Sequence, residues 1–251
     1  GAGEVSTFIR SVNNLPLLVE RTMMWDADAR AGSAEAALDS TNMQWFFAEG
    51  AQGALRTNLI LANPNDAPVT VTVTFMLESG APIARTYDVG PLARRTIAFD
   101  DVPAVAGRSF GMVVDATLPI AAERTTYLDA PRERQGGHSS AGVPYPSTQW
   151  YFAEGSNWKI FRSYMLLLNP GSAAANVRIE YHTMTGAHYA TAHVVSPKSR
   201  LTVDTLDAEP RLDGQHFWMA VTSDQPIAAE RSMYWDRGVG SLSEGHNSHG
   251  V

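Results

Sequence analysis

The segment Val69-Thr70-Val71-Thr72-Val73-Thr74-Phe75-Met76-Leu77-Glu78 decides the class of fold. Its apolar side chains alternate with threonine and other residues, and a period of two places every second side chain on the same face of a β-strand. Gly80-Ala81-Pro82 marks a turn directly after it, and Ile83 to Val89 predicts the next strand. The pattern therefore predicts antiparallel β-structure with one face buried.

Further short strands follow on both sides of this pair. With residues 45–49, 57–62, 96–99, 110–115 and 119–129 the number reaches about seven strands in roughly 85 residues. This number and spacing are typical of an immunoglobulin-like β-sandwich. Helical propensity is confined to Ala27 to Leu38, which we expect to form either a short helix or a polar connector.

The whole pattern occurs twice in the chain. Three matched pairs of segments show the repeat: Trp45–Gly50 with Trp150–Gly155, Leu118–Arg124 with Gln225–Arg231, and Gly137–Val143 with Gly245–Val251. The step grows from 105 to 108 residues along the chain, as loop insertions would produce. Self-similarity at a fixed period is typical of modular arrays.

A third, partial copy opens the chain. Leu15–Asp26 matches Gln225–Asp236, and Phe8–Val12 matches Phe217–Val221. We therefore expect the last two strands of a repeat at the start of the sequence. Either the chain is an excerpt from a longer tandem array, or residues 5–25 complete the fold of the first full repeat.

The predicted fold is all-β, with two tandem immunoglobulin-like modules of about seven strands each after the partial repeat. The predicted division is residues 1–44 for the trailing strands and a linker, 45–147 for the first full repeat and 148–251 for the second.

Composition excludes several classes of function. The chain has 251 residues and no cysteine, which excludes disulfides, thiolate metal sites and cysteine nucleophiles. Its 19 basic and 26 acidic residues leave a net charge of −7, which argues against nucleic acid as a partner. No apolar run is long enough to span a bilayer, so membrane insertion is not expected.

The recurring motifs together resemble a known kind of bacterial module. They are Trp-x-Phe-Ala-Glu-Gly, Leu-x-Asn-Pro, Pro-Ile-x-Ala-Glu-Arg-x-Met-Tyr-Trp and Gly-Gly-His-x-Ser. The set is similar to tandem repeats of unassigned function in large secreted or cell-surface bacterial proteins. The resemblance implies an extracellular or cell-surface location and a modular role, and it brings no catalytic residues. The chain departs from the pattern at Leu128, which stands where the other copies have Trp25 and Trp235.

A recurring arginine lies within an apolar row of the last predicted strand. Such an arginine must either extend its charged head to solvent or find a carboxylate. Strand one of each copy supplies a glutamate, so we predict ion pairs between Arg124 and Glu49 and between Arg231 and Glu154. The alternative is an exposed guanidinium in both modules.

His138 and His246 lie in the glycine-flanked segments after the last predicted strand. We expect them to hydrogen-bond backbone at the junction with the next module. The alternative is a metal site formed by Glu244, His246 and His249, but the first copy lacks its equivalent, so no metal site and no cofactor are predicted. A loose calcium site would draw on four aspartates: Asp26, Asp28, Asp129 and Asp236.

The second copy is richer in aromatic residues. We consider Trp158, Tyr181 and Trp218 as a platform for sugar rings, because flat aromatic rings stack on the apolar faces of sugars. The alternative places Trp218 in the core, where it replaces Met112, and Trp158 under its own loop. Three histidines accompany these residues on the hairpin that turns at Thr185-Gly186, namely His182, His188 and His193.

Gly107-Arg108-Ser109-Phe110-Gly111 matches the Gly-x-Ser-x-Gly pattern of hydrolases. That motif requires a strand-to-helix elbow, whereas this segment leads into a predicted strand, and the second copy has no serine there. We therefore do not expect a catalytic Ser109.

These observations favour a non-enzymatic structural or interaction module, a spacer or adhesion-type repeat. Its expected partners are neighbouring repeats or other copies of the chain, with strand exchange through residues 5–25 as a route to assembly. The alternative function is a carbohydrate-binding module that recognises polysaccharide through the second repeat, and a hydrolase is the third and weakest hypothesis.

Overall fold

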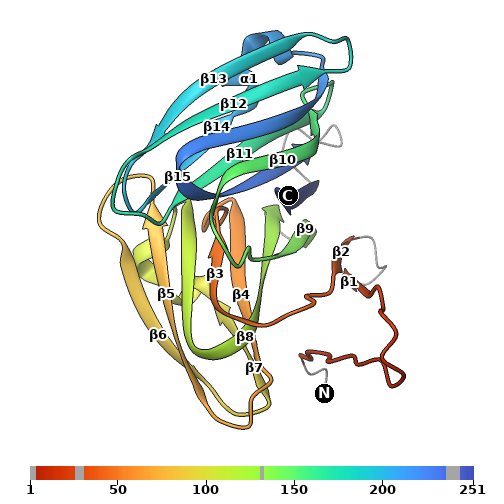
Figure 1. Cartoon of the computed structure of the whole chain (residues 1–251), viewed down its shortest axis with the longest axis vertical. Helices are drawn as coiled ribbons and strands as arrows, with labels where there is room; N and C mark the ends of the chain where they lie inside the picture. The colour runs from red at the N-terminus through yellow and green to blue at the C-terminus, as the bar shows by residue number, and fades with distance from the viewer. Residues whose placement is uncertain (1–3, 26–30, 131–132, 236–243) are drawn as a thin grey trace.

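The computed structural model describes residues 4–25, 31–130, 133–235 and 244–251. It contains two β-sandwich modules of seven strands each and a small hairpin, which confirms the predicted fold class. The second module is stacked on the first along the long axis of the molecule (Figure 1). The described part of the chain has no helix with the length and apolar character needed to cross a bilayer.

The first module extends from β3 to β9. Its elements are β3 (Asn42–Phe47), β4 (Leu55–Asn63), β5 (Val69–Leu77), β6 (Ile83–Val89), β7 (Ala93–Ala98), the 3-10 turns η1 (Phe99–Asp101) and η2 (Pro103–Val105), β8 (Phe110–Ala130) and β9 (Glu133–Ala141).

The second module extends from β10 to β16. Its elements are β10 (Ser147–Ser156), β11 (Phe161–Asn169), β12 (Ala175–Thr183), β13 (His188–Val195), β14 (Ser199–Asp204), the helix α1 (Thr205–Ala208), the turn η3 (Pro210–Leu212), β15 (His216–Trp235) and β16 (Glu244–His249).

One long strand in each module belongs to both sheets. The first half of β8 pairs with β5 and β3, and its second half pairs with β4 and β9. The same division holds for β15, which pairs first with β12 and β10 and then with β11 and β16. Pro119 and Pro226 lie where these strands cross between the sheets, a position where a missing N–H leaves no ladder bond unmade. The two strands expected at 110–115 and 119–129 are therefore one.

The core of each module lies between its sheets. In the first module Phe75 contacts Phe99 and Phe110 edge-on, with ring centroids 4.9 and 5.3 Å apart. The Trp45 indole donates to the backbone oxygen of Ile120 at 3.0 Å. Trp150 repeats this bond in the second module at 2.9 Å. The shared tryptophan thus ties the first strand to the crossing point of the long strand.

The seventh strand of each module comes from a segment that we expected to be a linker. Residues 137–141 lie in β9 and residues 245–249 lie in β16, and each pairs with the second half of the long strand. Gly137 permits this pairing, since a Cβ there would lie 2.6 Å from the backbone oxygen of Thr126. The glycine-rich composition therefore reflects close strand packing instead of a flexible linker.

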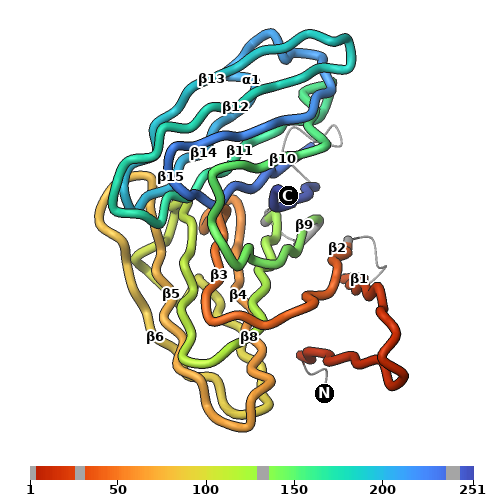
Figure 2. Tube along the Cα trace, in the orientation of Figure 1, coloured from red at the N-terminus to blue at the C-terminus, as the bar shows by residue number. Residues whose placement is uncertain are grey.

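The partial repeat forms a separate two-stranded hairpin, β1 (Glu20–Trp25) with β2 (Ala31–Ala36). β2 lies in the stretch with helical propensity, so the helix expectation was wrong; pairing with β1 and packing against β9 override local propensity. Residues 8–12, expected to be a strand, lie in the irregular segment before β1 (Figure 2). The first module has seven strands without the hairpin, so residues 5–25 do not complete its fold.

Candidate functional site

A buried polar network joins the two modules, and Arg124 on β8 is its centre. Arg124 Nη1 donates to the backbone oxygen of Glu49 at 2.6 Å and to Glu230 Oε2 at 2.7 Å. Its Nη2 donates to Ser140 and, at 2.7 Å, to Asn247 Oδ1. The Arg124 side chain has no exposed surface. One guanidinium from the first module thus binds two elements of the second.

The carboxylate of Glu230, on β15, is the counterpart of Arg124. It accepts hydrogen bonds from the backbone N–H groups of Ala48 at 3.0 Å and Glu49 at 3.2 Å. Asn247 on β16 donates to Glu230 Oε2 at 3.1 Å. Because the carboxylate is satisfied almost wholly by the first module, separating the modules would leave it without these partners.

Glu49 completes the network from the first module. Its Oε2 lies 3.6 Å from Arg124 Nη2, so the structure brings the predicted partners together, although Glu230 lies closer to the guanidinium. Ser232 and Tyr234 of the second module each donate to Glu49 Oε1 at 2.6 Å. Burial opposes ionisation of this carboxyl, but nearby positive charge and these hydroxyl donors hold its pKa below the ordinary value.

His138 on β9 lies at the same junction, as expected, but its hydrogen-bond partner is a side chain instead of backbone. Its Nε2 lies 3.2 Å from the Tyr234 hydroxyl oxygen. The Tyr234 proton is donated to Glu49, so His138 must be the donor in this bond, which places a proton on its Nε2. Burial lowers the pKa of His138 to about 4, so Arg124 supplies the positive charge beside Glu49 at neutral pH.

Apolar side chains surround the polar network. Five residues of the first module belong to the same buried cluster as the core of the second: Phe46, Ala48, Met76, Val113 and Val143. Gly111 lies among them, and a Cβ at this position would lie 2.7 Å from Leu168 Cδ1 of the second module. The junction is therefore closely packed as well as hydrogen-bonded.

A second group of polar contacts joins the two modules beside the Arg124 network. Arg200 on β14 donates through Nε to the backbone oxygen of Ala48 at 3.2 Å and forms an ion pair with Glu78 at 2.9 Å. Ser199 donates to the backbone oxygen of Leu77 at 2.9 Å. Burial lowers the pKa of the Arg200 guanidinium. Ala48 therefore binds the second module through both its N–H and its carbonyl oxygen.

The hairpin β1–β2 repeats this junction on the first module. In the sequence repeat Arg21 corresponds to Arg124 and Glu123 to Glu230. Arg21 Nη1 lies 2.7 Å from Glu123 Oε2, the distance found for the equivalent pair between the modules. Ser33 and Ser139 lie 3.1 Å apart through their hydroxyls. The hairpin thus contacts the first module through the same arginine–glutamate pair, although the Arg21 side chain is 47 % exposed and that of Arg124 is fully buried.

The equivalent network of the second module faces solvent. Arg231 Nη1 lies 2.9 Å from Glu154 Oε2, the second predicted pair. The Glu154 side chain is 63 % exposed, against 6 % for Glu49. His246, predicted to lie at a junction, accepts from Arg231 through Nδ1 at 3.0 Å within its own module. The arginine–glutamate pair therefore recurs in the second module, where solvent takes the place of a neighbouring module.

The aromatic residues predicted to bind sugar divide between the surface and the core. Trp158 and Trp218 are 39 % and 42 % exposed, so Trp218 does not occupy the core. Tyr181 is buried, and burial raises its pKa to about 12, which excludes it from a surface platform. It lies on the inner face because it continues the buried alternation of Val177 and Ile179 along β12.

Exposed rings form a row on the outer face of β15 and β12. Trp158 lies 5.6 Å from His216, which is two residues before Trp218 on the same face. Trp218 stacks on His182 with centroids 3.9 Å apart and planes 5° apart. Tyr151 on β10 lies two register positions from Trp218 and is 49 % exposed. We call Tyr151, Trp158, His182, His216 and Trp218 the aromatic face.

The aromatic face corresponds to the surface of the first module that the second module covers. The strand registers equate His182 with Met76 and Trp218 with Gly111, so the expected equivalence of Trp218 with Met112 was wrong by one residue. An indole at the place of Gly111 would overlap a neighbour seated as Leu168 is. The aromatic face is therefore not built to receive another module in the arrangement of the junction.

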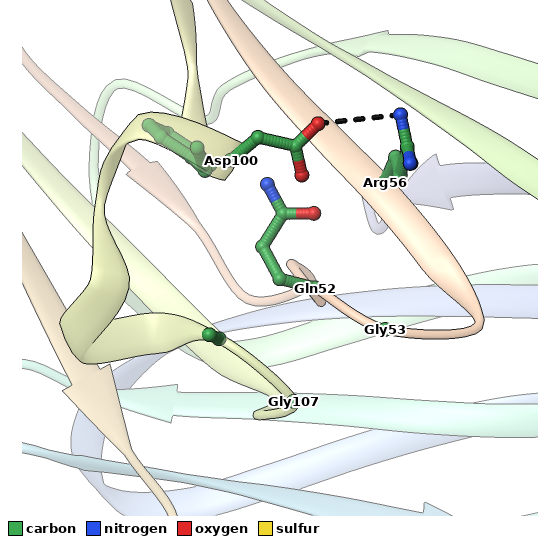
Figure 3. A pocket seen from close by; sticks show the side chains of 7 residues that line it. Gln52, Gly53, Arg56, Asp100 and Gly107 are labelled. Atoms are coloured by element: carbon green, nitrogen blue, oxygen red, sulfur yellow. Dashed lines mark ion pairs between the residues drawn. The ribbon is translucent and has the colours of Figure 1, made fainter.

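The hydrolase-like motif has no elbow geometry. Ser109 forms an isolated bridge with Ala51 and leads into β8. Beside it lies a hollow of about 270 Å³ whose polar side chains are Gln52, Arg56 and Asp100 (Figure 3). Arg56 and Asp100 are 3.3 Å apart and neutralise each other. The hollow brings together neither a nucleophile with a base nor two carboxylates.

The sites considered for metals from the linker motifs are not assembled among the described residues. Glu244 accepts from the Trp235 indole at 2.5 Å, and His246 accepts from Arg231. The loose calcium site cannot be placed, because Asp26, Asp28, Asp236 and the side chain of Asp129 lie outside the described residues.

Glu230 and Asn247 are the functional residues that sequence reasoning missed. The signal for Glu230 was present, since its motif Ala-Ala-Glu-Arg recurs with Glu123 in the first module. Within a single module the glutamate lies on the strand face opposite the arginine and has no evident partner there. Asn247 carries no such signal, because the first copy has Ser139 there.

Comparisons with known proteins give no family. No family model matches the chain, and no curated protein matches it. Among solved structures it is similar to Thermotoga maritima 1070, with a TM-score of 0.38 and 14 % identity over 41 % of this chain and 94 % of that one. It is also similar to the Anabaena sensory rhodopsin transducer, with a TM-score of 0.30 and 20 % identity over 34 % and 97 %.

The major pilin of Streptococcus pyogenes has a TM-score of 0.20 and 12 % identity, covering 79 % of this chain and 92 % of the pilin. These similarities are too distant to support an argument about function. The function proposed below therefore rests on the residues of this chain.

Proposed function

We propose that this chain is a non-enzymatic structural module, a rigid spacer formed by repeats that stack through buried junctions. The observation that carries the proposal is the network around Arg124, in which two glutamates, one arginine and one asparagine are buried between modules. Breaking such a group would strand buried charges, which resists bending between modules. The pair of Arg21 and Glu123 at the hairpin supports the view that the junction is a repeated design.

A secreted or cell-surface setting belongs to the same proposal. It is supported by the similarity of the motifs to tandem bacterial surface repeats. Assembly by strand exchange is a variant of the proposal. Since β1 and β2 pair with each other, we expect them to reach a partner by stacking instead, and light scattering after size exclusion would detect a dimer that depends on residues 5–25.

The rigidity of the spacer can be measured directly, because the chain has no cysteine and accepts a pair of spin labels without background. We would label Thr86→Cys in the first module and Asp213→Cys in the second, both at exposed positions. A narrow distribution of distances between the labels is expected. A broad distribution in the unaltered chain would refute the spacer proposal, and Gly111→Trp should broaden it by disrupting the packing against Leu168.

Carbohydrate binding is the second candidate function, and the aromatic face favours it. Trp158 and Trp218 offer exposed rings on one side of the second module, where the covered equivalent in the first module is apolar. Stacking of sugar rings on such surfaces needs both ring area and polar neighbours, which the histidines provide. A polysaccharide screen with Trp158→Ala and Trp218→Ala tests it, with the exposed Tyr145→Ala as the matched control. Binding that all three variants retain would reject the face as the site.

A further inference from the structure

We propose that Glu180, His182 and His188 bind one divalent transition-metal ion on the outer face of the second module. One ligand atom from each of the three side chains lies within 4.8 Å of the other two. The strand register explains why they meet. His182 on β12 and His188 on β13 are direct cross-strand partners, and Glu180 lies two residues before His182 on the same face of the strand.

The neighbours of the site hold its ligands in place. Trp218 stacks on the His182 ring at 3.9 Å and limits its rotation. The β12–β13 ladder fixes the spacing of all three backbone positions. His188 is exposed, so it can turn toward an ion and solvent can reach the open side of the site. Only small side-chain rotations are then needed to close three ligands around a metal.

The fold itself does not require these three residues. The registers of the first module place Thr74, Met76 and Pro82 at the equivalent positions. None of these is a metal ligand of the imidazole or carboxylate type, although the first module has the same strands in the same order. The three ligands are thus present on the exposed surface of the second module and absent from the equivalent surface of the first module, which the second module covers.

The donor set selects the class of metal. Two imidazoles and one carboxylate suit zinc, nickel or copper, whereas calcium and magnesium prefer oxygen ligands alone. Three protein ligands leave a fourth position for water or another small ligand, as in sites that are not purely structural. Zinc is the probe we would use first, since it has no redox chemistry to complicate binding.

Arg178 is the competitor that an ion must displace. Its Nη2 lies 3.0 Å and its Nε 3.1 Å from Glu180 Oε1, on the exposed side of β12. His188 Nε2 lies 3.7 Å from the same oxygen. An ion that bound Glu180 would take the place of the guanidinium. Removing Arg178 should therefore strengthen metal binding, whereas a merely structural cluster would show no such gain.

The test is calorimetric titration of the untagged full chain with Zn²⁺ at neutral pH. We expect one saturable site per chain, at least about tenfold weaker in His188→Ala and in Glu180→Gln, because loss of a ligand exceeds the effect of losing an outer partner. Arg178→Gln should bind more tightly. His193→Ala is the matched control, since His193 lies on the opposite face of the same strand and bonds Thr191.

Two results would overturn the proposal. One is the absence of saturable Zn²⁺ binding by the unaltered chain. The other is unchanged affinity in both His188→Ala and Glu180→Gln, with circular dichroism showing that each is folded. The site lies apart from the module junction, so either result leaves the spacer proposal intact.

Discussion

Replacement of Arg124 by methionine should destabilise the chain far more than the same change at Arg231. Both arginines occupy the same position in their repeats and both side chains are buried. Methionine keeps most of the apolar stem but removes the charge. The comparison therefore isolates what the neighbouring module contributes to an otherwise equivalent residue.

The expected loss of stability in each variant depends on which charged groups remain buried without a partner. Without Arg124, the carboxylates of Glu49 and Glu230 remain buried near each other, and Asn247 loses the donor to its Oδ1. Breaking a buried ion pair by removing one partner costs about 3–5 kcal/mol. Without Arg231, the Glu154 carboxylate is already in water, so the expected loss is about 1–2 kcal/mol and comes from the bonds to His246 and Ser248 more than from the ion pair.

Urea unfolding followed by circular dichroism measures both free energies of unfolding. A further variant that combines Arg124→Met with Glu49→Gln and Glu230→Gln should recover part of the loss, because the stranded charges are gone. The reasoning is refuted if Arg124→Met and Arg231→Met differ by less than about 0.5 kcal/mol, which is within the scatter expected for unrelated sites.

Three further predictions concern pH and packing. Burial lowers the pKa of His138 to about 4, so the folded state binds fewer protons than the unfolded state. The free energy of unfolding should therefore fall as pH drops from about 6.5 to 4, by about 3 kcal/mol at most. The variant His138→Gln should flatten this part of the profile of stability against pH. Burial raises the pKa of Glu35 on the hairpin to about 7, so docking of the hairpin on the first module should weaken as pH rises from about 4.5 through 7. Hydrogen exchange of β1 and β2 would measure this pH dependence, and Glu35→Gln should abolish it. Gly111→Trp should lower stability by about 2 kcal/mol through overlap with Leu168. Trp218→Phe at the equivalent open position keeps an aromatic ring on His182 and should leave unfolding nearly unchanged; equal losses would contradict the assignment of the two faces.

Most of the fold can be predicted from local sequence patterns. The alternation in residues 69–78 predicts β5 because its apolar side chains lie on the buried face of the strand. In the sequence repeat Phe217–Trp218 matches Phe110–Gly111, so strand parity places Trp218 on the outer face, one residue from the position of Met112. Parity would equally have placed Tyr181 inside, since it follows Val177 and Ile179 at steps of two.

The polar network at the junction is harder to predict from sequence, because its hydrogen-bonding partners come from two different modules. Glu230 and Tyr234 look like an exposed row when one repeat is considered alone, and their partner Glu49 lies more than 180 residues away. Helical propensity likewise misjudged residues 31–36, where the decisive contacts come from β1 and β9. Such partners follow from the packing of whole modules, which no window of local sequence contains.

The strand that each module shares between its two sheets has a mechanical consequence. A sandwich made of two independent sheets can yield under load when one sheet slides over the other. Here β8 and β15 run through both layers, so any sliding must bend or tear a continuous backbone and break hydrogen bonds on both sides of the proline crossing. A tensile force along the stacked modules would thus be resisted by covalent continuity as well as by packing.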